Sequence, residues 1–388
     1  MEMTQVYNIL NTVTTEILGE SAVVQEDLSN VVDIGVAFAN ITNGLDNYVR
    51  SLQDHIGRMV FVNREYRGRA PRVLMDGWEY GSILEKVRAA LPEATENESW
   101  ELQNGASYDP NVFTAPTISA KFFNKRVTFE IPISITEKQV KSSFSNATQL
   151  NAFYSMIYTA IANSMTIKTD ALIMRNINTL IAETLYNEFP SAQYSSGSGV
   201  KAVNLLYLYN QSVPQAAQIA TAAAAVQDPE FIRYAAYIMG LYSDRLEVMS
   251  TLFNVGGTEK FTPRDRQHIV LLSEFKRAAD VFLQSDIFHD EFTRLPEAES
   301  VTYWQGSGTG YGFSATSKIN VVTSGGHTVE ASGILGVIFD RDTLGVANVD
   351  RHVTTNYNPK AEFWNEWHKF DAGYFLDLDE NGIVFFAA

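Results

Sequence analysis

The sequence predicts an α+β fold in which one strand leads into a single long helix and further strands return near the C-terminus. Residues 127–135 alternate apolar and polar side chains, as a strand with one buried face does. Apolar residues then recur on one stripe over residues 148–187, and no Gly or Pro interrupts the chain there before Pro190. A mainly helical block and several short strand-forming runs follow. This order predicts one mixed domain with a second domain inserted into it.

The composition limits the chemistry that the chain can carry out. Its 388 residues are enough for about two or three domains. Cysteine is absent, which excludes disulfides, thiolate catalysis and cysteine-ligated metal centres. With 29 Lys and Arg against 45 Asp and Glu the formal charge is −16, which argues against tight binding of nucleic acid because phosphate binding is driven by Lys and Arg. We expect no signal peptide and no membrane span, and therefore synthesis in the cytosol.

The long helical stretch is the predicted structural centre. A helix over residues 148–187 would be roughly 60 Å long at about 1.5 Å per residue, far longer than the average globular helix of about 11–12 residues. We expect a spine of an extended subunit and not an active site. The stripe predicts Ile157, Ile161, Met165 and Leu172 inward and Lys168 and Arg175 toward solvent or a neighbour.

Before the strand, residues 76–123 are broken up by Gly and Pro, with aromatic side chains scattered among polar ones. Two interpretations are open: an ordered excursion whose aromatics are buried by another chain, or a loosely folded functional loop. Aromatic residues among polar ones favour the first, because interfaces are enriched in them. The aromatic interface candidates are Trp78, Trp100, Phe113, Phe122 and Phe123.

Residues 63–72 form a locally basic stretch. It is either a phosphate-contacting patch or an arm that pairs with acidic neighbours. The acidic overall charge favours the second interpretation. Arg67 and Arg69 are therefore added to the candidates for a subunit interface.

After Pro190 a Ser/Gly-rich run at 195–199 predicts a flexible joint and a domain boundary. Residues 201–290 are mostly helical in pattern, including an alanine-rich segment at 216–226 and an amphipathic one at 231–253, with strand character at 268–272. Strand-forming runs follow. They lie at residues 319–323, 334–339, 351–357, 372–378 and 383–386.

Two motifs resemble ligand sites without matching them. The glycine-rich stretch 306–312 lacks the Lys-Ser/Thr end of a P-loop, so a surface loop is favoured. Residues 377–382 match the first half of a calcium loop, but its twelfth position is Ala388 where a bidentate Glu is needed. We favour a turn between two strands, with weak calcium binding as the alternative. The chain has no cluster of residues typical of catalysis, and we expect neither enzyme activity nor a cofactor.

Several stretches, taken in their order, resemble the major capsid proteins of tailed bacteriophages, in particular of short-tailed phages of Gram-positive hosts. They are 78–87 (WEYGSILEKV), 120–136 (AKFFNKRVTFEIPISIT), 333–346 (GILGVIFDRDTLGV), 354–359 (TTNYNP) and 370–375 (FDAGYF). The likeness spans most of the chain. The matching stretches are structural segments and not catalytic motifs.

The resemblance implies the capsid fold named after phage Hong Kong ninety-seven, with four parts. Residues 1–75 would be its N-terminal arm and 76–130 its extended β loop, which lies over a neighbouring subunit. The peripheral domain with its spine helix would take 131–200 and 334–375. The inserted axial domain would take 201–333 and 376–388.

The implied function is that of a structural protein that self-assembles into an icosahedral phage head enclosing double-stranded DNA. The resemblance implies pentamers and hexamers of the chain, a portal and a scaffold protein as partners, no tight DNA binding, and location in the virion after assembly in the host cytoplasm. The alternative is an encapsulin-like compartment shell. An enzyme of unknown type is disfavoured by the lack of a site.

Overall fold

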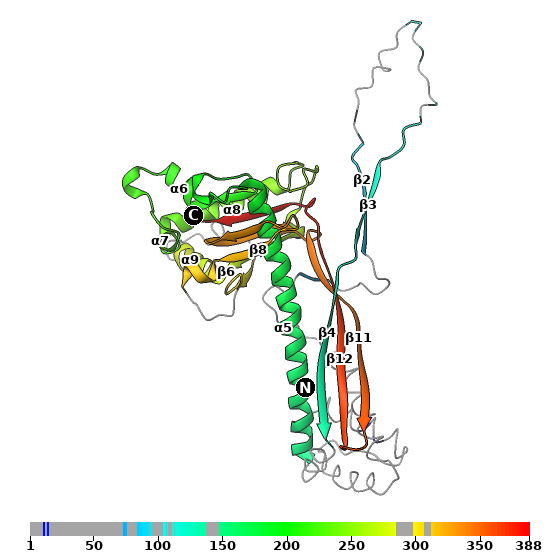
Figure 1. The fold of residues 1–388 in the computed structure, drawn as a ribbon. Helices are drawn as coiled ribbons and strands as arrows, with labels where there is room; N and C mark the ends of the chain where they lie inside the picture. Colours follow the sequence, from blue (N-terminus) through cyan, green and yellow to red (C-terminus); the bar gives the residue numbers. More distant parts are fainter. Residues whose placement is uncertain are drawn as a thin grey trace.

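The computed structural model describes residues 11, 14, 73–75, 84–92, 94, 104–105, 107, 111, 113–136, 147–284, 298–305 and 312–388. Only the backbone is described for residues 147–156 and 283–284. Helices and strands are mixed, as the sequence predicts. Within these ranges the chain forms one very long helix, two larger sheets and two hairpins (Figure 1).

The four-stranded sheet is a long, narrow ribbon with the order β1-β11-β12-β4. Its strands are β1 (Leu74–Met75), β11 (Leu344–Asn358), β12 (Phe363–Leu376) and β4 (Arg126–Thr136). β12 lies antiparallel between β11 and β4. Strand β4 has the alternating burial that its sequence predicts, and Phe129 stacks on Phe370 of β12 with 4.8 Å between the ring centroids.

The five-stranded sheet holds the main hydrophobic core, with the order β5-β13-β10-β6-β7. Its strands are β5 (Ala202–Asn204), β13 (Gly382–Phe386), β10 (Ile334–Asp340), β6 (Gln267–Leu272) and β7 (Glu299–Val301). All residues of β10 and β13 are buried, as the near-continuous apolar sequence of a central strand requires.

Helices surround this sheet. They are α6 (Leu205–Ser212), α7 (Ala222–Ala225), α8 (Pro229–Leu246), α9 (Ser273–Gln284) and α10 (Phe313–Thr316). Asp228 caps α8 by accepting hydrogen bonds from the amides of Glu230 and Phe231, and Pro229 begins the helix. The hairpin of β8 (Ile319–Val322) and β9 (Thr328–Ala331) contacts the long helix.

The long helix α5 (Ala147–Glu188) joins the two sheets (Figure 1). Its first half lies along β11 and β12, with Ile161 and Met165 buried and Lys168 exposed, as the stripe predicts. In the second half Leu172 is buried and Arg175 is exposed, as predicted. The burial is otherwise not confined to one stripe, because this half contacts β5, β13, β8 and β9 and is buried on almost every side. The polar side chains there need partners, and Asn178 donates to the backbone oxygen of Trp304 at 2.8 Å.

Two further expectations differ from the structure. The alanine-rich segment 216–226 is helical only at Gln215–Ala217 and at Ala222–Ala225, because Thr221 caps a new turn there. Residues 334–340, assigned from the sequence to the same domain as the spine helix, form β10 and pair with β6 and β13. That strand therefore belongs to the five-stranded sheet, and its apolar residues alone do not indicate which sheet it joins.

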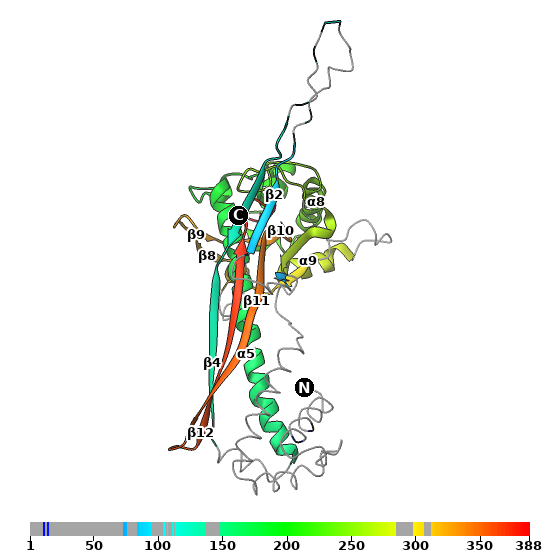
Figure 2. The same ribbon diagram turned by 90° about the vertical axis from the view of Figure 1, so that its right-hand side faces the viewer.

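The hairpin of β2 (Leu84–Ala89) and β3 (Ile118–Phe123) extends away from both sheets. In Figure 1 and in the view turned by 90° (Figure 2) it continues the long axis of the four-stranded sheet, at the end nearer the five-stranded sheet. Only residues 124–125 separate β3 from β4, so the hairpin is a direct extension of a strand of that sheet. Within the described residues, no helix is both long and apolar enough to cross a membrane.

The continuity of α5 gives a first testable prediction. We expect Ala162→Pro, in the middle of the helix, to cost about 3 kcal/mol or more and to yield insoluble protein, because proline removes a helical hydrogen bond and clashes with the preceding turn. Ala147→Pro, at the first residue of α5, is the matched control and should be tolerated. Soluble yield and thermal denaturation measure both, and equal behaviour of the two variants would contradict a continuous helix.

Candidate functional site: the β2–β3 hairpin

The hairpin has two chemically different faces because side chains alternate along each strand. β2 and β3 are antiparallel, with Leu84 opposite Phe123 and Lys86 opposite Lys121. Leu84, Lys86, Lys121 and Phe123 are half-buried and face the rest of the subunit, as does Arg88. We call this side the inner face and the opposite side the outer face.

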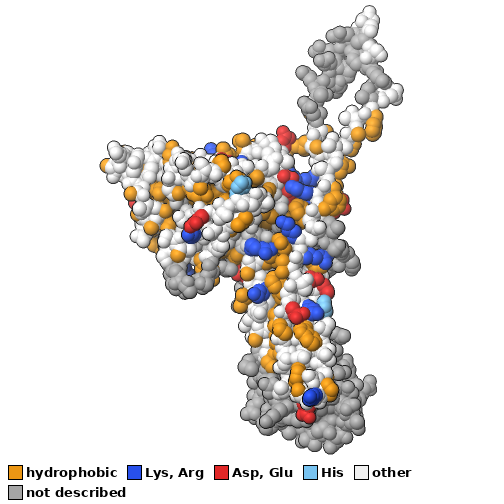
Figure 3. All heavy atoms as spheres, viewed as in Figure 1, with side chains coloured by type: hydrophobic (Ala, Val, Ile, Leu, Met, Phe, Trp, Pro, Cys, Tyr) orange, Lys and Arg blue, Asp and Glu red, His pale blue; other side chains and the backbone are white. Residues whose placement is uncertain are grey.

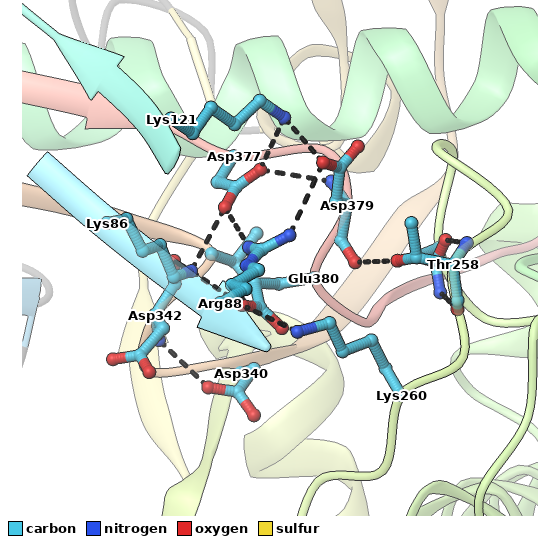
Figure 4. A network of polar contacts seen from close by, with 12 residues as sticks. Lys86, Arg88, Lys121, Thr258, Lys260, Asp340, Asp342, Asp377, Asp379 and Glu380 are labelled. Atoms are coloured by element: carbon cyan, nitrogen blue, oxygen red, sulfur yellow. Dashed lines mark hydrogen bonds and ion pairs between the residues drawn. The ribbon is translucent and has the colours of Figure 1, made fainter. Parts of the chain in front are cut away.

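The inner face is held by ion pairs to the turn between β12 and β13. Lys86 contacts Asp377 at 3.0 Å and Glu380 at 2.5 Å. Lys121 contacts Asp377 at 2.9 Å and Asp379 at 2.7 Å. These side chains come from two segments more than 250 residues apart in the sequence, and Figure 4 shows them converging.

Arg88 lies in the middle of this cluster. It contacts Asp377, Asp379 at 3.3 Å and Glu380 at 2.6 Å. Lys260, from the loop after α8, reaches Glu380 at 3.5 Å from the other side. We call these residues the charged anchor. Its members are Lys86, Arg88, Lys121, Lys260, Asp377, Asp379 and Glu380.

Two carboxylates of the anchor are removed from water, Asp377 completely and Glu380 almost completely, whereas Asp379 is partly exposed. A buried charge is expensive unless it is paired and hydrogen-bonded, and Asp377 receives contacts from Lys86, Arg88 and Lys121. Near the base of the hairpin, the inner face also has an apolar contact, because the rings of Phe123 and Phe375 lie 5.3 Å apart. The hairpin is thus fixed by charge and by one aromatic pair.

The turn that carries the carboxylates is itself fixed by backbone hydrogen bonds. The amide of Asp377 donates to the oxygen of Thr343 at 2.6 Å, and the amide of Gly382 donates to Phe253 at 2.8 Å. The hydroxyl of Thr258 donates to the backbone oxygen of Asp379 at 2.7 Å. The anchor therefore sits on a rigid base, so the hairpin's position is set by its own cations.

The pKa values follow from this geometry. Burial by itself would raise the pKa of Asp377, but hydrogen bonds from Lys121 and Lys86 outweigh burial and hold it below its ordinary 3.8. Burial would lower the pKa of Lys121, and its hydrogen bonds to Asp379 and Asp377 raise it above its ordinary 10.5. Both groups stay charged over the whole physiological range of pH.

The calcium-like motif at 377–382 is a turn between strands, as favoured from the sequence. In the described chain its carboxylates face four cations, Lys86, Arg88, Lys121 and Lys260, against three acidic groups. This excess of positive charge disfavours a metal cation. Among the described residues no group of three or more metal-ligating side chains is placed to hold a metal ion.

The outer face of the hairpin is apolar and open to solvent. Val87, Ile118 and Phe122 are each more than 60% exposed. Leu91 and Phe113, toward the tip, are exposed as well. Figure 3 shows hydrophobic side chains along the hairpin where it leaves the rest of the molecule. Several exposed apolar side chains on one face are typical of a surface that meets another protein.

The interface candidates taken from the sequence differ in their exposure. Phe122 and Phe113 are exposed, whereas Phe123 faces inward against Phe375. Trp78, Trp100, Arg67 and Arg69 lie outside the described residues, and they stay predictions. Sequence reasoning missed the charged anchor, although the alternate cations Lys86 and Arg88 are typical of a strand with one charged face.

Comparison with known proteins places this geometry in a family. The family model of Phi29-like phage major capsid proteins matches residues 10–386. The chain belongs to this family. It is therefore a structural capsid protein of a tailed-phage head, and its place is in the virion. A comparison with curated proteins found no match.

Solved structures of low identity also resemble this capsid protein. The capsid of Staphylococcus phage Andhra matches with 11% identity over 81% of this chain and 83% of that one, with a TM-score of 0.46. A structure of the head fibre and inner core protein of native bacteriophage P68 matches with 11% identity over 84% and 86%, with a TM-score of 0.49. These scores are too low to argue from, so the assignment rests on the family model.

The pKa shifts predict how the anchor responds to pH. Because the folded pKa of Asp377 is lowered, its contribution is present above its unfolded pKa and is lost as pH falls through the folded pKa. At neutral pH we expect Asp377→Asn to cost about 3–5 kcal/mol, since it removes the buried carboxylate that Lys86, Arg88 and Lys121 share. This cost should shrink on acidification, and the free energy of unfolding of both proteins from about pH 2 to pH 7 measures it. Asp280→Asn, an exposed residue of α9, is the control.

The contribution of Lys121 follows the opposite rule. Its pKa is raised, so its contribution is complete below 10.5 and is lost as pH rises through the folded pKa. A cost of Asp377→Asn that is independent of pH would contradict this account of the anchor.

Proposed function

We propose that the chain assembles into a closed icosahedral head of pentamers and hexamers that encloses double-stranded DNA, and that it does so without enzyme activity. This proposal is supported mainly by the family match over residues 10–386. The hairpin with one charged and one apolar face supports it as well. The match to phage capsid proteins favours a phage head over an encapsulin-like compartment.

The division of the chain into parts belongs to the same proposal. Residues 1–75 act as the arm, and the β2–β3 hairpin lies within the extended loop at 76–130. The four-stranded sheet with the first half of α5 corresponds to the peripheral domain. The five-stranded sheet corresponds to the axial domain, with the change that residues 334–340 are part of it.

The hairpin is the proposed contact with a neighbouring subunit. Its inner face is occupied by its own subunit, so the outer face is left for another copy. A buried large apolar side chain contributes about 1.5–3 kcal/mol, and Val87, Ile118 and Phe122 lie on one face of the hairpin where a neighbour would bury them. A ring or shell needs this kind of contact, in which one patch meets a different patch on the next copy.

Portal and scaffold proteins are proposed as further partners, and assembly takes place in the host cytoplasm. Negative-stain electron microscopy of the expressed protein, alone and with a scaffold candidate from the same genome, tests the function. Closed shells or capsomers support it, and a compact monomer under all conditions would contradict it.

A third prediction concerns the outer face. We expect Phe122→Ser to leave the stability of the free subunit within about 0.5 kcal/mol, because this side chain is largely exposed, and to reduce the yield of shells strongly. Trp100→Ala and Phe113→Ala should behave in the same way. Val322→Ser, an equally exposed apolar residue of β8, is the matched control. Lower stability with normal shells would show that Phe122 supports the fold and not the interface.

The fourth prediction concerns DNA, which has to slide during packaging and leave during infection. With a charge of −16, we expect only weak retention of DNA by shells or capsomers, with repulsion screened over about 8–10 Å at cellular salt. Arg67 and Arg69 then pair with acidic groups of protein. Binding across a salt series measures this. Sub-micromolar, steeply salt-dependent binding that disappears on Arg67→Ala and Arg69→Ala would make the stretch a nucleic-acid contact.

A further inference from the structure

An apolar loop of the same subunit lies beside the hairpin. Residues 247–262 expose Val248, Leu252 and Phe261, although the loop is well ordered by hydrogen bonds. Ser250 and Lys260 pair as an antiparallel bridge, with backbone hydrogen bonds of 2.9 and 3.0 Å. We call this segment the apolar loop.

The apolar loop and the hairpin meet at a single carboxylate. Oε1 of Glu380 accepts from Lys86 of the hairpin at 2.5 Å and lies 3.5 Å from Nζ of Lys260 of the loop (Figure 4). Two exposed apolar surfaces, the outer face of the hairpin and the apolar loop, therefore belong to segments that converge on one point. In water such surfaces attract each other, because burying either removes apolar area from solvent.

This arrangement poses a problem of orientation. If the hairpin turned about its long axis, its apolar face could cover the loop and the turn, and the surface available to a neighbour would be lost. Lys86, Arg88 and Lys121 would then leave the carboxylates of the turn. The fully buried Asp377 would face Val87 and Phe122 in place of three cations, and an unpaired buried carboxylate is strongly disfavoured.

We propose that Lys86, Arg88 and Lys121 are positioning residues that select which face of the hairpin lies against its own subunit. Their partners Asp377, Asp379 and Glu380 accept the charged face and reject the apolar one, so the outer face stays free for a neighbouring copy. This rests on the proposed function, in which a neighbour meets that face.

Each carboxylate of the anchor has more than one cationic partner, and such redundancy favours one orientation of the hairpin strongly over the other. Asp377 has three cationic partners, and Asp379 and Glu380 each have at least two. Buried ion pairs often add little net stability compared with apolar residues of the same size. They do penalise the wrong arrangement heavily, which is how specificity is usually obtained. Loss of the anchor should therefore change the orientation of the hairpin without an equal change in the stability of the subunit, whereas a purely structural role would change both together.

The test replaces the hairpin's charges and their partners by neutral side chains of similar size. The neutral variant combines Lys86→Met, Arg88→Met, Lys121→Met, Asp377→Asn, Asp379→Asn and Glu380→Gln. Spin labels on Glu85→Cys, on the outer face of β2, and Tyr237→Cys, exposed on α8, report the orientation by the distance between them. The absence of native cysteine makes this labelling specific.

In the otherwise unaltered chain we expect one narrow distance distribution. In the neutral variant we expect a second population, a midpoint of thermal unfolding close to that of the original protein, and a loss of shell yield. The matched control neutralises an exposed ion pair away from the hairpin, with Lys318→Met and Glu330→Gln, and should change none of the three. A neutral variant with one unchanged distance and a normal yield of shells would overturn the inference and leave the proposed function standing.

A second pair of variants keeps the test valid if the neutral variant does not fold. Lys121→Glu places a negative charge beside Asp379 and should produce the second population. Adding Asp379→Lys restores opposite charges and should return the single distance and the shells. Failure of the double variant to restore either would also overturn the inference. If the original chain shows one distance but never forms shells, the proposed function fails while the role of the anchor in orientation is upheld.

Discussion

The buried carboxylate of Asp377 is the constraint on which the outer part of the subunit depends. A group removed from water in this way must keep its cations, and those cations lie on one face of a hairpin that joins directly onto β4. Because the turn is fixed by hydrogen bonds to Thr343, Phe253 and Thr258, the position of the hairpin follows from the position of the five-stranded sheet. Assembly then begins from a subunit whose projecting arm already has a defined direction.

The long helix α5 also fixes the relative position of parts of the subunit, over a greater distance. Its first half lies along the ribbon of β11, β12 and β4, and its second half enters the core around β13. One rigid element thus links the four-stranded sheet, which continues into the hairpin, to the five-stranded sheet, whose strand β13 directly follows the carboxylates. The two connections, α5 and the charged anchor, hold the same two bodies at separate points, which fixes their relative orientation better than either does alone.

Local patterns in the sequence predict the bounds of the elements well, since the alternating stretch 127–135 and the uninterrupted stretch 148–187 closely match β4 and α5. What they do not predict is which distant elements meet. Strand β10 is apolar except for its last residue, Asp340, so its sequence fits either sheet. The second half of α5 is buried on almost every side only because strands from three other segments surround it. Long-range strand pairing decides which sheet β10 joins and how deeply α5 is buried. Such pairing produces no periodic pattern in the sequence.

The anchor shows the same limit for the site. The carboxylates at 377–380 stand out in the sequence as half of a calcium loop, and the cations at 86 and 88 stand out as alternate residues of a strand. Neither pattern indicates that the two groups pair, because more than 250 residues separate them and only the fold brings them together. A cluster of acidic residues in a chain of net charge −16 is therefore as consistent with a cationic partner from the same chain as with a metal ion. For this capsid protein that partner is the inner face of its own hairpin, and the apolar face is left for the shell.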